Sequence, residues 1–174
     1  MKNFTQNFIG ILALVFTMSF IVNAQQIGDV YDGGYIFQIN DDDTGLVASL
    51  EDLGEFVWGC QGNDISGADG TAIGTGNQNT IDIEAGCTTS GTAADICANL
   101  TLGGYSDWFL PSKDELNEMY LNLHQQGLGG FTGYYYLSST EYGPLYAWIQ
   151  GFFNGSQSSN FKFNNFNVRA VRAF

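Results

Sequence analysis

The chain has 174 residues, 44% of them hydrophobic and 15% aromatic, and its formal net charge at pH 7 is −13. This length suits a single domain with a buried core. Eighteen acids against five cations make nucleic acids and sulfated glycans unsuitable partners, because the protein would repel their anionic groups.

The first 24 residues have the pattern of a secretory signal peptide. Lys2 is the only charge before position 29, an apolar run covers Ile9–Val22, and Val22-Asn23-Ala24 fits a cleavage site. The run is shorter than the roughly 20 residues of a membrane helix, so we expect no membrane span. The sequence therefore predicts an exported protein, secreted or held at the cell surface. Its residues 25–174 would form one domain with a net charge of −14.

The region after the leader is predicted to form short strands. Ile27–Ile39 contains a Gly-Gly turn and then a β-rich run, and Gly45–Leu50 follows a turn of Asn and Asp residues, which indicates a hairpin. Gly54–Trp58 adds a further apolar stretch. Gly59–Gly76 is too rich in glycine for a regular element, and a loop of this length is either functional or held by other contacts.

Three helices are expected in the middle of the chain. Asn77–Ala85 favours a short helix, and Thr92–Leu100 a better one, with Thr92 and Asp95 at the spacing of a capping box. The clearest helix is Ser112–Gln126, which has the same box at its start and an apolar stripe of Leu116, Met119, Tyr120 and Leu123.

The chain turns to β-structure after Gly127. Asn154-Gly155 is a strong hairpin signal between two of the four predicted strands. These strands are Tyr134–Ser138, Leu145–Phe153, Ser156–Phe163 and Phe166–Phe174. The predicted fold class is α+β, with two or three short helices packed on a mainly antiparallel sheet and long Gly-rich loops.

The order of several motifs resembles the Lcl C-terminal-like family over about Gly28–Phe174. These motifs are GGYSDWFLPSKDELNEMY at Gly103–Tyr120, the terminal VRAVRAF, and between them Ser138-Ser139-Thr140-Glu141, Ala147-Trp148 and Phe153-Asn154-Gly155. The resemblance implies a domain of bacterial surface and secreted proteins, with a fold related to C-type lectins and to formylglycine-generating (sulfatase-modifying) enzymes. One member of the family binds sulfated glycosaminoglycans, but the net charge of −14 argues against that ligand here.

Three cysteines follow the leader, and export places them where disulfides persist. They allow one bond and one free thiol. We favour Cys87–Cys97, because the segment between them is short and Cys97 falls on a predicted helix that packs back toward the loop. Cys60–Cys87 is the rival pairing.

Charged residues suggest two further features. The turn Asp41-Asp42-Asp43 could hold Ca²⁺ through Asp41 and Asp43, although it lacks the last-position Glu of a twelve-residue calcium loop and could equally be a solvated turn. No other cofactor is expected. Arg169 or Arg172 is predicted to form an internal ion pair with Glu141, since guanidinium groups pair well with buried carboxylates.

Aromatic side chains are concentrated late in the chain, with 17 Phe, Tyr and Trp from Tyr105 onward. Tyr135, Tyr142 and Tyr146, with Asn154 of the neighbouring turn, are the predicted ligand contacts, because exposed Tyr rings can stack on sugars or peptides. The predicted function is non-catalytic binding of a glycan or an extracellular protein. One alternative is an assembly role in which an aromatic face joins copies or a larger envelope complex, and another is a carboxylate-dependent hydrolase.

Overall fold

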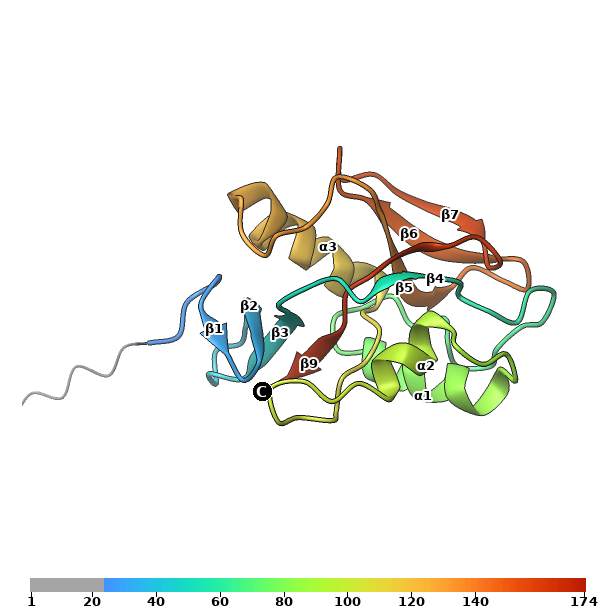
Figure 1. Ribbon diagram of the computed structural model, residues 1–174, viewed down its shortest axis with the longest axis horizontal. Coiled ribbons are helices and arrows are strands. Elements are labelled where there is room, and N and C mark those ends of the chain that lie inside the picture. Colours follow the sequence, from blue (N-terminus) through green and yellow to red (C-terminus); the bar gives the residue numbers. More distant parts are fainter. Residues whose placement is uncertain (1–23) are drawn as a thin grey trace, which may run out of the picture.

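The structure is a computed structural model that describes residues 24–174, so the predicted signal peptide lies outside the described residues except for Ala24. Two β-sheets stand side by side along the long axis of the molecule (Figure 1). Sheet A consists, in spatial order, of β1 (Val30–Tyr31), β2 (Gly34–Ile39), β3 (Gly45–Ser49) and β9 (Val171–Ala173). Sheet B consists of β4 (Gly54–Phe56), β8 (Phe166–Val168), β5 (Tyr135–Glu141), β6 (Tyr146–Gly151) and β7 (Gln157–Phe161).

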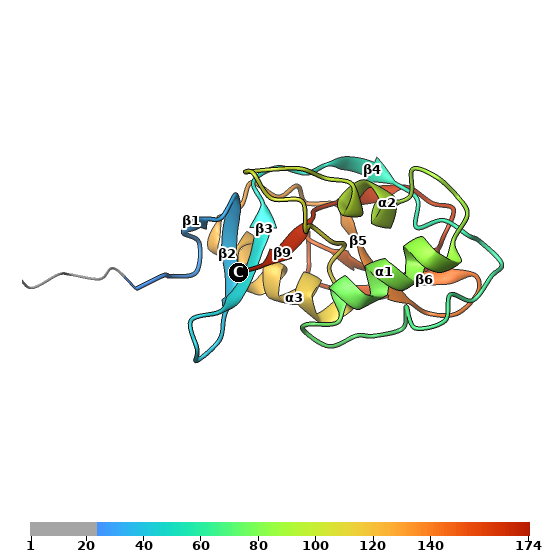
Figure 2. The ribbon, with the colours of Figure 1, turned by 90° about the horizontal axis from the view of Figure 1, so that it is seen from below.

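All neighbouring strands are antiparallel except β5 and β8, which are parallel. Three short helices, α1 (Gly76–Gly86), α2 (Ala93–Ala98) and α3 (Lys113–Asn122), pack on these sheets, and a 3-10 turn (His124–Gln126) follows α3. In both ribbon views α1 and α2 lie together on one side of sheet B, while α3 lies on the other and reaches sheet A (Figures 1 and 2). The predicted α+β class is therefore confirmed.

The start of α3 follows the sequence prediction. The Ser112 hydroxyl accepts a hydrogen bond from the Glu115 backbone N–H at 3.3 Å, and the Glu115 carboxylate accepts one from the Ser112 N–H at 2.7 Å. The box predicted for α2 is only half formed. Thr92 accepts from the Asp95 N–H, whereas the Asp95 carboxylate accepts from Gly91 instead of Thr92.

The last predicted strand, Phe166–Phe174, divides between the two sheets, so the expectation of one sheet was wrong. β8 pairs within sheet B and β9 within sheet A, and Arg169 and Ala170 between them are buried. Arg169 donates to the backbone carbonyls of Ser49 at 2.7 Å and Gly129 at 3.0 Å, which satisfies a buried guanidinium at the junction.

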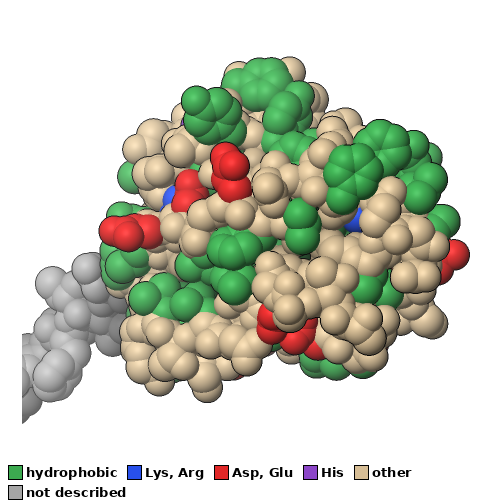
Figure 3. Space-filling view, turned by 45° about the vertical axis from the view of Figure 1, so that its right-hand side comes forward, with side chains coloured by type: hydrophobic (Ala, Val, Ile, Leu, Met, Phe, Trp, Pro, Cys, Tyr) green, Lys and Arg blue, Asp and Glu red, His purple; other side chains and the backbone are tan. Residues whose placement is uncertain are grey.

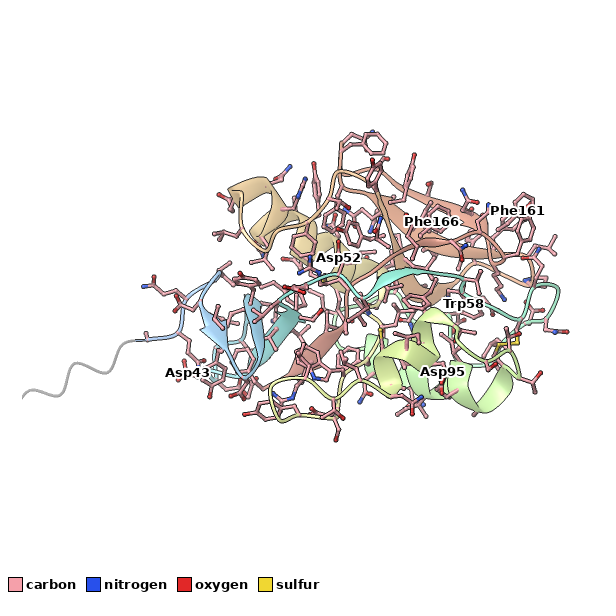
Figure 4. The ribbon with its side chains drawn as sticks, in the orientation of Figure 1. Asp43, Asp52, Trp58, Asp95, Phe161 and Phe166 are labelled. Atoms are coloured by element: carbon pink, nitrogen blue, oxygen red, sulfur yellow. A yellow bond between two sulfur atoms is a disulfide. The ribbon has the colours of Figure 1, made fainter. Side chains whose placement is uncertain are left out.

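The apolar core has two parts, one on each side of sheet B. The first lies between this sheet and the α1–α2 pair and includes Trp58, whose ring points inward in Figure 4, together with Ile83, Cys97, Leu137 and Ile149. The second lies under α3 and includes Phe37, Leu116, Met119, Tyr136 and Phe152. β5 contributes to both because alternate strand residues face opposite sides.

The disulfide joins Cys60 to Cys87, with a Cα–Cα distance of 5.6 Å, so the favoured Cys87–Cys97 pairing was wrong and its rival is correct. The inward face of α2 carries the Cys97 thiol into the first core cluster, where it is free and fully buried. Cys60 and Cys87 remain only partly buried at the edge of that cluster, where their side chains can meet.

The predicted pairing of Glu141 with Arg169 or Arg172 was also wrong. Glu141 pairs with Lys162, and both side chains are almost fully buried. Arg169 pairs with Asp52 at 2.7 Å, and Arg172 contacts Asp107 and Asp32. The two arginines lie where the chain passes into sheet A, and the acids near that junction come from other segments: Asp52 from the β3–β4 connection, Asp32 from the β1–β2 turn, and Asp107 from the segment before α3.

The long Gly-rich loop between β4 and α1 is tied down along its length. Lys162 donates to the Asn63 carbonyl at 2.8 Å, and Glu141 accepts from the Ile65 N–H. Further on, Thr140 donates to the Gly70 carbonyl at 2.8 Å, and Glu115 accepts from the Gly74 N–H at 2.7 Å. The loop is therefore held by side chains of distant strands and of α3.

Candidate functional site

Five aromatic side chains lie on or beside the pair β6–β7, and we call them the β6–β7 aromatic strip. They are Tyr142, Tyr146, Trp148, Phe161 and Phe163. The register places Tyr146 opposite Phe161, with ring centroids 4.7 Å apart, and Phe161 stacks on Phe163 at 5.2 Å. Tyr142 meets the edge of Trp148 at 5.2 Å.

α3 covers only one end of the sheet face that carries this strip. Gln150 of β6 donates to Asn117 of α3 at 2.9 Å, and Gln157 of β7 donates to the Lys113 carbonyl. The Lys113 ammonium lies 4.7 Å from the centre of the Trp148 ring, at the beginning of the helix. Tyr146 and Phe161, which pair beyond Trp148 on the same face, are farther from α3.

The outer part of the strip is open to water. The exposed fractions are 58% for Tyr142, 38% for Phe161 and 57% for Phe163, and Tyr146 is partly exposed. Figure 4 shows Phe161 at the end of sheet B farthest from sheet A. On the face drawn in Figure 3, exposed hydrophobic side chains form several groups, while cationic side chains appear only as small patches.

The structure divides the four predicted ligand contacts between the two ends of the β5–β6 hairpin. Tyr142 and Tyr146 flank its turn and belong to the strip, with the Tyr142 N–H donating to the Tyr146 carbonyl. Tyr135 and Asn154 lie at the other end, where Tyr135 contacts Phe153 at 5.3 Å and Asn154 accepts from the Ser156 N–H within the β6–β7 turn. These four residues therefore do not form one site.

Sequence reasoning missed three members of the strip. A tryptophan in a predicted strand is expected in the core, yet Trp148 is only partly buried, with Lys113 and Tyr142 against its ring. Phe161 and Phe163 alternate with Lys162, and this alternation signals a shared face. Since Lys162 is buried and both Phe rings are exposed, the burial pattern is the reverse of the usual one.

The Asp41–Asp43 turn is stabilised by its own hydrogen bonds. Asp42 accepts from the Thr44 N–H at 3.2 Å and from its hydroxyl at 2.6 Å, and these bonds lower the pKa of the Asp42 carboxyl. Within residues 24–174 no group of three His, Cys, Asp or Glu side chains is arranged to hold a metal ion. The turn geometry gives no support for calcium at Asp41 and Asp43.

Three further acids, Asp64, Asp69 and Glu141, line a cavity of about 360 Å³ beside the Gly-rich loop. Glu141 is already engaged there, by the Lys162 ammonium and by the Ile65 N–H at 3.0 Å. Its carboxylate stabilises the loop, which leaves the exposed Asp64 and Asp69 as the groups facing solvent.

Glu115 is the most isolated buried carboxylate. It is fully buried and accepts only backbone N–H groups, from Gly74, Gly76 and Ser112. Burial raises the pKa of its carboxyl, and the N–H donors act in the opposite direction. This arrangement joins the Gly-rich loop to the start of α3 and is structural.

A groove of about 350 Å³ runs along α1, between that helix and the segment Ser106–Phe109. Ile81 of α1 is 51% exposed there, and Trp108 and Phe109 form part of the wall. Two acids, Glu84 and Asp107, also line this groove. Burial, followed by the charge of Asp95, raises the pKa of the Glu84 carboxyl.

None of the helices in residues 24–174 is long and apolar enough to cross a membrane. The family model described as the Lcl C-terminal domain matches residues 39–172. This range contains all three helices and strands β3 to β8, together with the last residue of β2 and the first two residues of β9. Comparison of the sequence with curated proteins finds no match. The chain therefore belongs to the Lcl C-terminal domain family.

Proposed function

We propose that the protein is an exported, non-catalytic binding module that recognises a glycan or an extracellular protein through the β6–β7 aromatic strip. The observation that carries this proposal is the exposure of Tyr142, Phe161 and Phe163 on one end of sheet B. An apolar ring that stays exposed to water does not contribute the free energy that its burial would add to folding. Exposed rings that lie together are typical of interaction sites.

Between the two ligand classes, the residues of the strip favour a glycan. Tyr142 and Tyr146 combine an apolar ring with a hydroxyl, which suits the alternating apolar faces and hydroxyl groups of a sugar. Ser159, opposite Trp148 in the register, adds a hydroxyl to the same face. The proposal thus keeps Tyr142 and Tyr146 as contacts and replaces Tyr135 and Asn154 by Phe161 and Phe163.

Export is part of the proposal and is supported by the leader-like sequence and by the Cys60–Cys87 disulfide, since such bonds persist in oxidising compartments. A relation of the fold to C-type lectins would fit this role. The ligand would be held without calcium, because the strip offers rings and hydroxyl groups instead of clustered carboxylates.

The test is binding of residues 25–174 to a broad glycan array, with calcium and with chelator, for the wild-type chain and two matched variants. Phe163→Ser removes a ring of the strip. Phe153→Ser is the control, because Phe153 has the same exposed fraction of 57% but lies beside Tyr135 at the other end of the hairpin. We expect binding that survives chelation and falls about ten-fold or more in Phe163→Ser only.

Other results would contradict the proposal in distinct ways. Loss of binding in Phe153→Ser alone would place the ligand at the Tyr135–Asn154 end. Loss in chelator would show a metal-dependent site. An array without any bound glycan, together with self-association that Phe163→Ser abolishes in sedimentation experiments, would favour the assembly role.

A further inference from the structure

The α1 groove lies away from the aromatic strip. Its first wall is the outer side of α1, where Asn77, Ile81 and Glu84 follow one another at helical spacing. The opposite wall is the segment before α3, which brings Ser106 and Asp107 to the rim. α1 and α2 cover one side of β5, whereas the strip shares the α3 side, so the two surfaces lie on opposite sides of sheet B (Figures 1 and 2).

The floor of the groove is apolar, and Ile81 is the apolar side chain of its helix wall. Trp108 and Phe109 are only 2% and 4% exposed and close the groove from beneath. Ile81 projects into solvent with half of its surface uncovered. The volume of about 350 Å³ falls at the lower end of the range for small-ligand pockets.

One of the two acids at the rim of the groove has no cationic partner among the described residues. Asp107 already forms an ion pair with Arg172, whose guanidinium donates a hydrogen bond to the Asp107 carboxylate. Glu84 forms no ion pair within residues 24–174, and neither does the nearby Asp95. A cationic group bound at Glu84 would therefore meet a carboxylate that no cationic side chain of the described residues pairs with, and the negative charge of Asp95 lies nearby.

We propose that the α1 groove binds a hexosamine unit with a free ammonium group, as found in glucosamine polymers, and that Glu84 contacts the ammonium. A pyranose ring offers one apolar face to Ile81, and its hydroxyl groups can reach the Asn77 amide and the Ser106 hydroxyl at the rim. The net charge of −14 attracts a polycationic glycan over a long range and repels a sulfated one.

This inference is independent of the aromatic strip. A neutral sugar would leave the Glu84 carboxylate partly desolvated without a partner, whereas an ammonium group would supply a charge-assisted hydrogen bond. An apolar amine without hydroxyl groups would not use Asn77 and Ser106. The combination of an apolar floor with Ile81 beside it, an unpaired acid and two neutral polar groups fits an amino sugar best.

The test compares two glycans that differ only at nitrogen: glucosamine oligomers and their fully N-acetylated counterparts of equal length. Calorimetric titration of residues 25–174 at about pH 6 keeps the amine protonated and most exposed carboxylates ionised. We expect the glucosamine oligomer to bind at least about ten-fold more tightly than the acetylated one, the size of one charge-assisted contact. Raising the salt concentration should weaken that binding.

Variants locate the binding. Glu84→Gln and Ile81→Ser should each weaken binding of the glucosamine oligomer, by about ten-fold and by about five-fold respectively. Glu55→Gln is the matched control, because Glu55 is an exposed acid on β4 outside the groove. Circular dichroism of each variant shows whether the fold is retained.

Three outcomes would overturn the proposal: no binding of the glucosamine oligomer, equal binding of both oligomers, or binding that Glu84→Gln and Glu55→Gln weaken to the same extent. The last would show diffuse attraction to the acidic surface. Phe163→Ser should leave this binding unchanged, so failure of the groove and failure of the strip can be distinguished.

Discussion

Replacing Lys162 by Met should destabilise the protein strongly, and far more than the same change at Lys113. The Lys162 ammonium is fully buried, lies 4.3 Å from the centre of the Trp58 ring, and donates to the Asn63 carbonyl and to Glu141. Met fills a similar volume but provides no charge. The Glu141 carboxylate, which is only 6% exposed, would then keep the Ile65 N–H as a partner and lose its counter-ion.

The expected loss follows from that geometry. Removing one member of a buried ion pair costs about 3–5 kcal/mol, because the other charge stays buried without compensation. The stability of a domain is typically about 5–15 kcal/mol, so Lys162→Met should remove a large share of it. Lys113→Met is the matched control. The Lys113 side chain is 23% exposed and lies 3.8 Å from Asp114, and a surface pair of this kind contributes less than about 1 kcal/mol.

Urea unfolding followed by tryptophan fluorescence, with the disulfide intact, measures both losses. The double variant Glu141→Leu/Lys162→Met should be more stable than the sum of the single losses predicts, because it leaves no unpaired buried charge. A loss below about 1 kcal/mol for Lys162→Met would refute the reasoning, since it would mean that water reaches Glu141 in the folded state.

The remaining predictions concern the disulfide, the buried thiol and the buried acid. Replacing Cys60 and Cys87 by Ser should lower the free energy of unfolding by about 3.5 kcal/mol, the chain-entropy value for a sequence separation of 27, and an unchanged urea midpoint would contradict it. Burial raises the pKa of the Cys97 thiol, so a thiol reagent should modify one group per chain only after denaturation; modification in the native state would contradict its burial. The Glu115 carboxyl has a folded-state pKa raised above 4.5, so its contribution to stability is fully present below that pH and is lost as pH rises through the folded value. As pH rises from 4.5 through the folded-state pKa, the free energy of unfolding of the wild-type chain should therefore fall relative to that of Glu115→Gln. Urea unfolding of both proteins at a series of pH values measures this, and a difference between them that does not change with pH would refute the raised pKa of Glu115.

Local signals predicted the helices well. Ser112 and Glu115 lie three residues apart and form their box within one turn, so the sequence contains the whole interaction. The hairpin at Asn154-Gly155 also follows from local geometry: Gly155 has a φ of 76°, which glycine adopts at no steric cost. Such features depend on neighbours in the chain and need no knowledge of the tertiary structure.

Contacts between distant segments were predicted poorly. The Cys60–Cys87 bond depends on which face of α2 carries Cys97 inward. The partner of Glu141 depends on Lys162 entering the core from the turn that directly follows β7. Lys162 looks exposed in sequence because a lysine between two Phe residues usually faces water. The order of the strands in sheet B decides which cation reaches Glu141, and a local sequence pattern does not reveal that order.

The four cations of the described chain explain why the exterior is so acidic. Each lies over an aromatic ring: Lys113 over Trp148, Lys162 over Trp58, Arg169 over Phe131 and Arg172 over Tyr105. Each also pairs with at least one acid. Because the contacts with the rings join segments far apart in the sequence, the cations act mainly within the fold and offer little charge to a ligand. The acids that remain on the surface, with exposed aromatic rings among them, favour neutral or cationic partners over anionic ones.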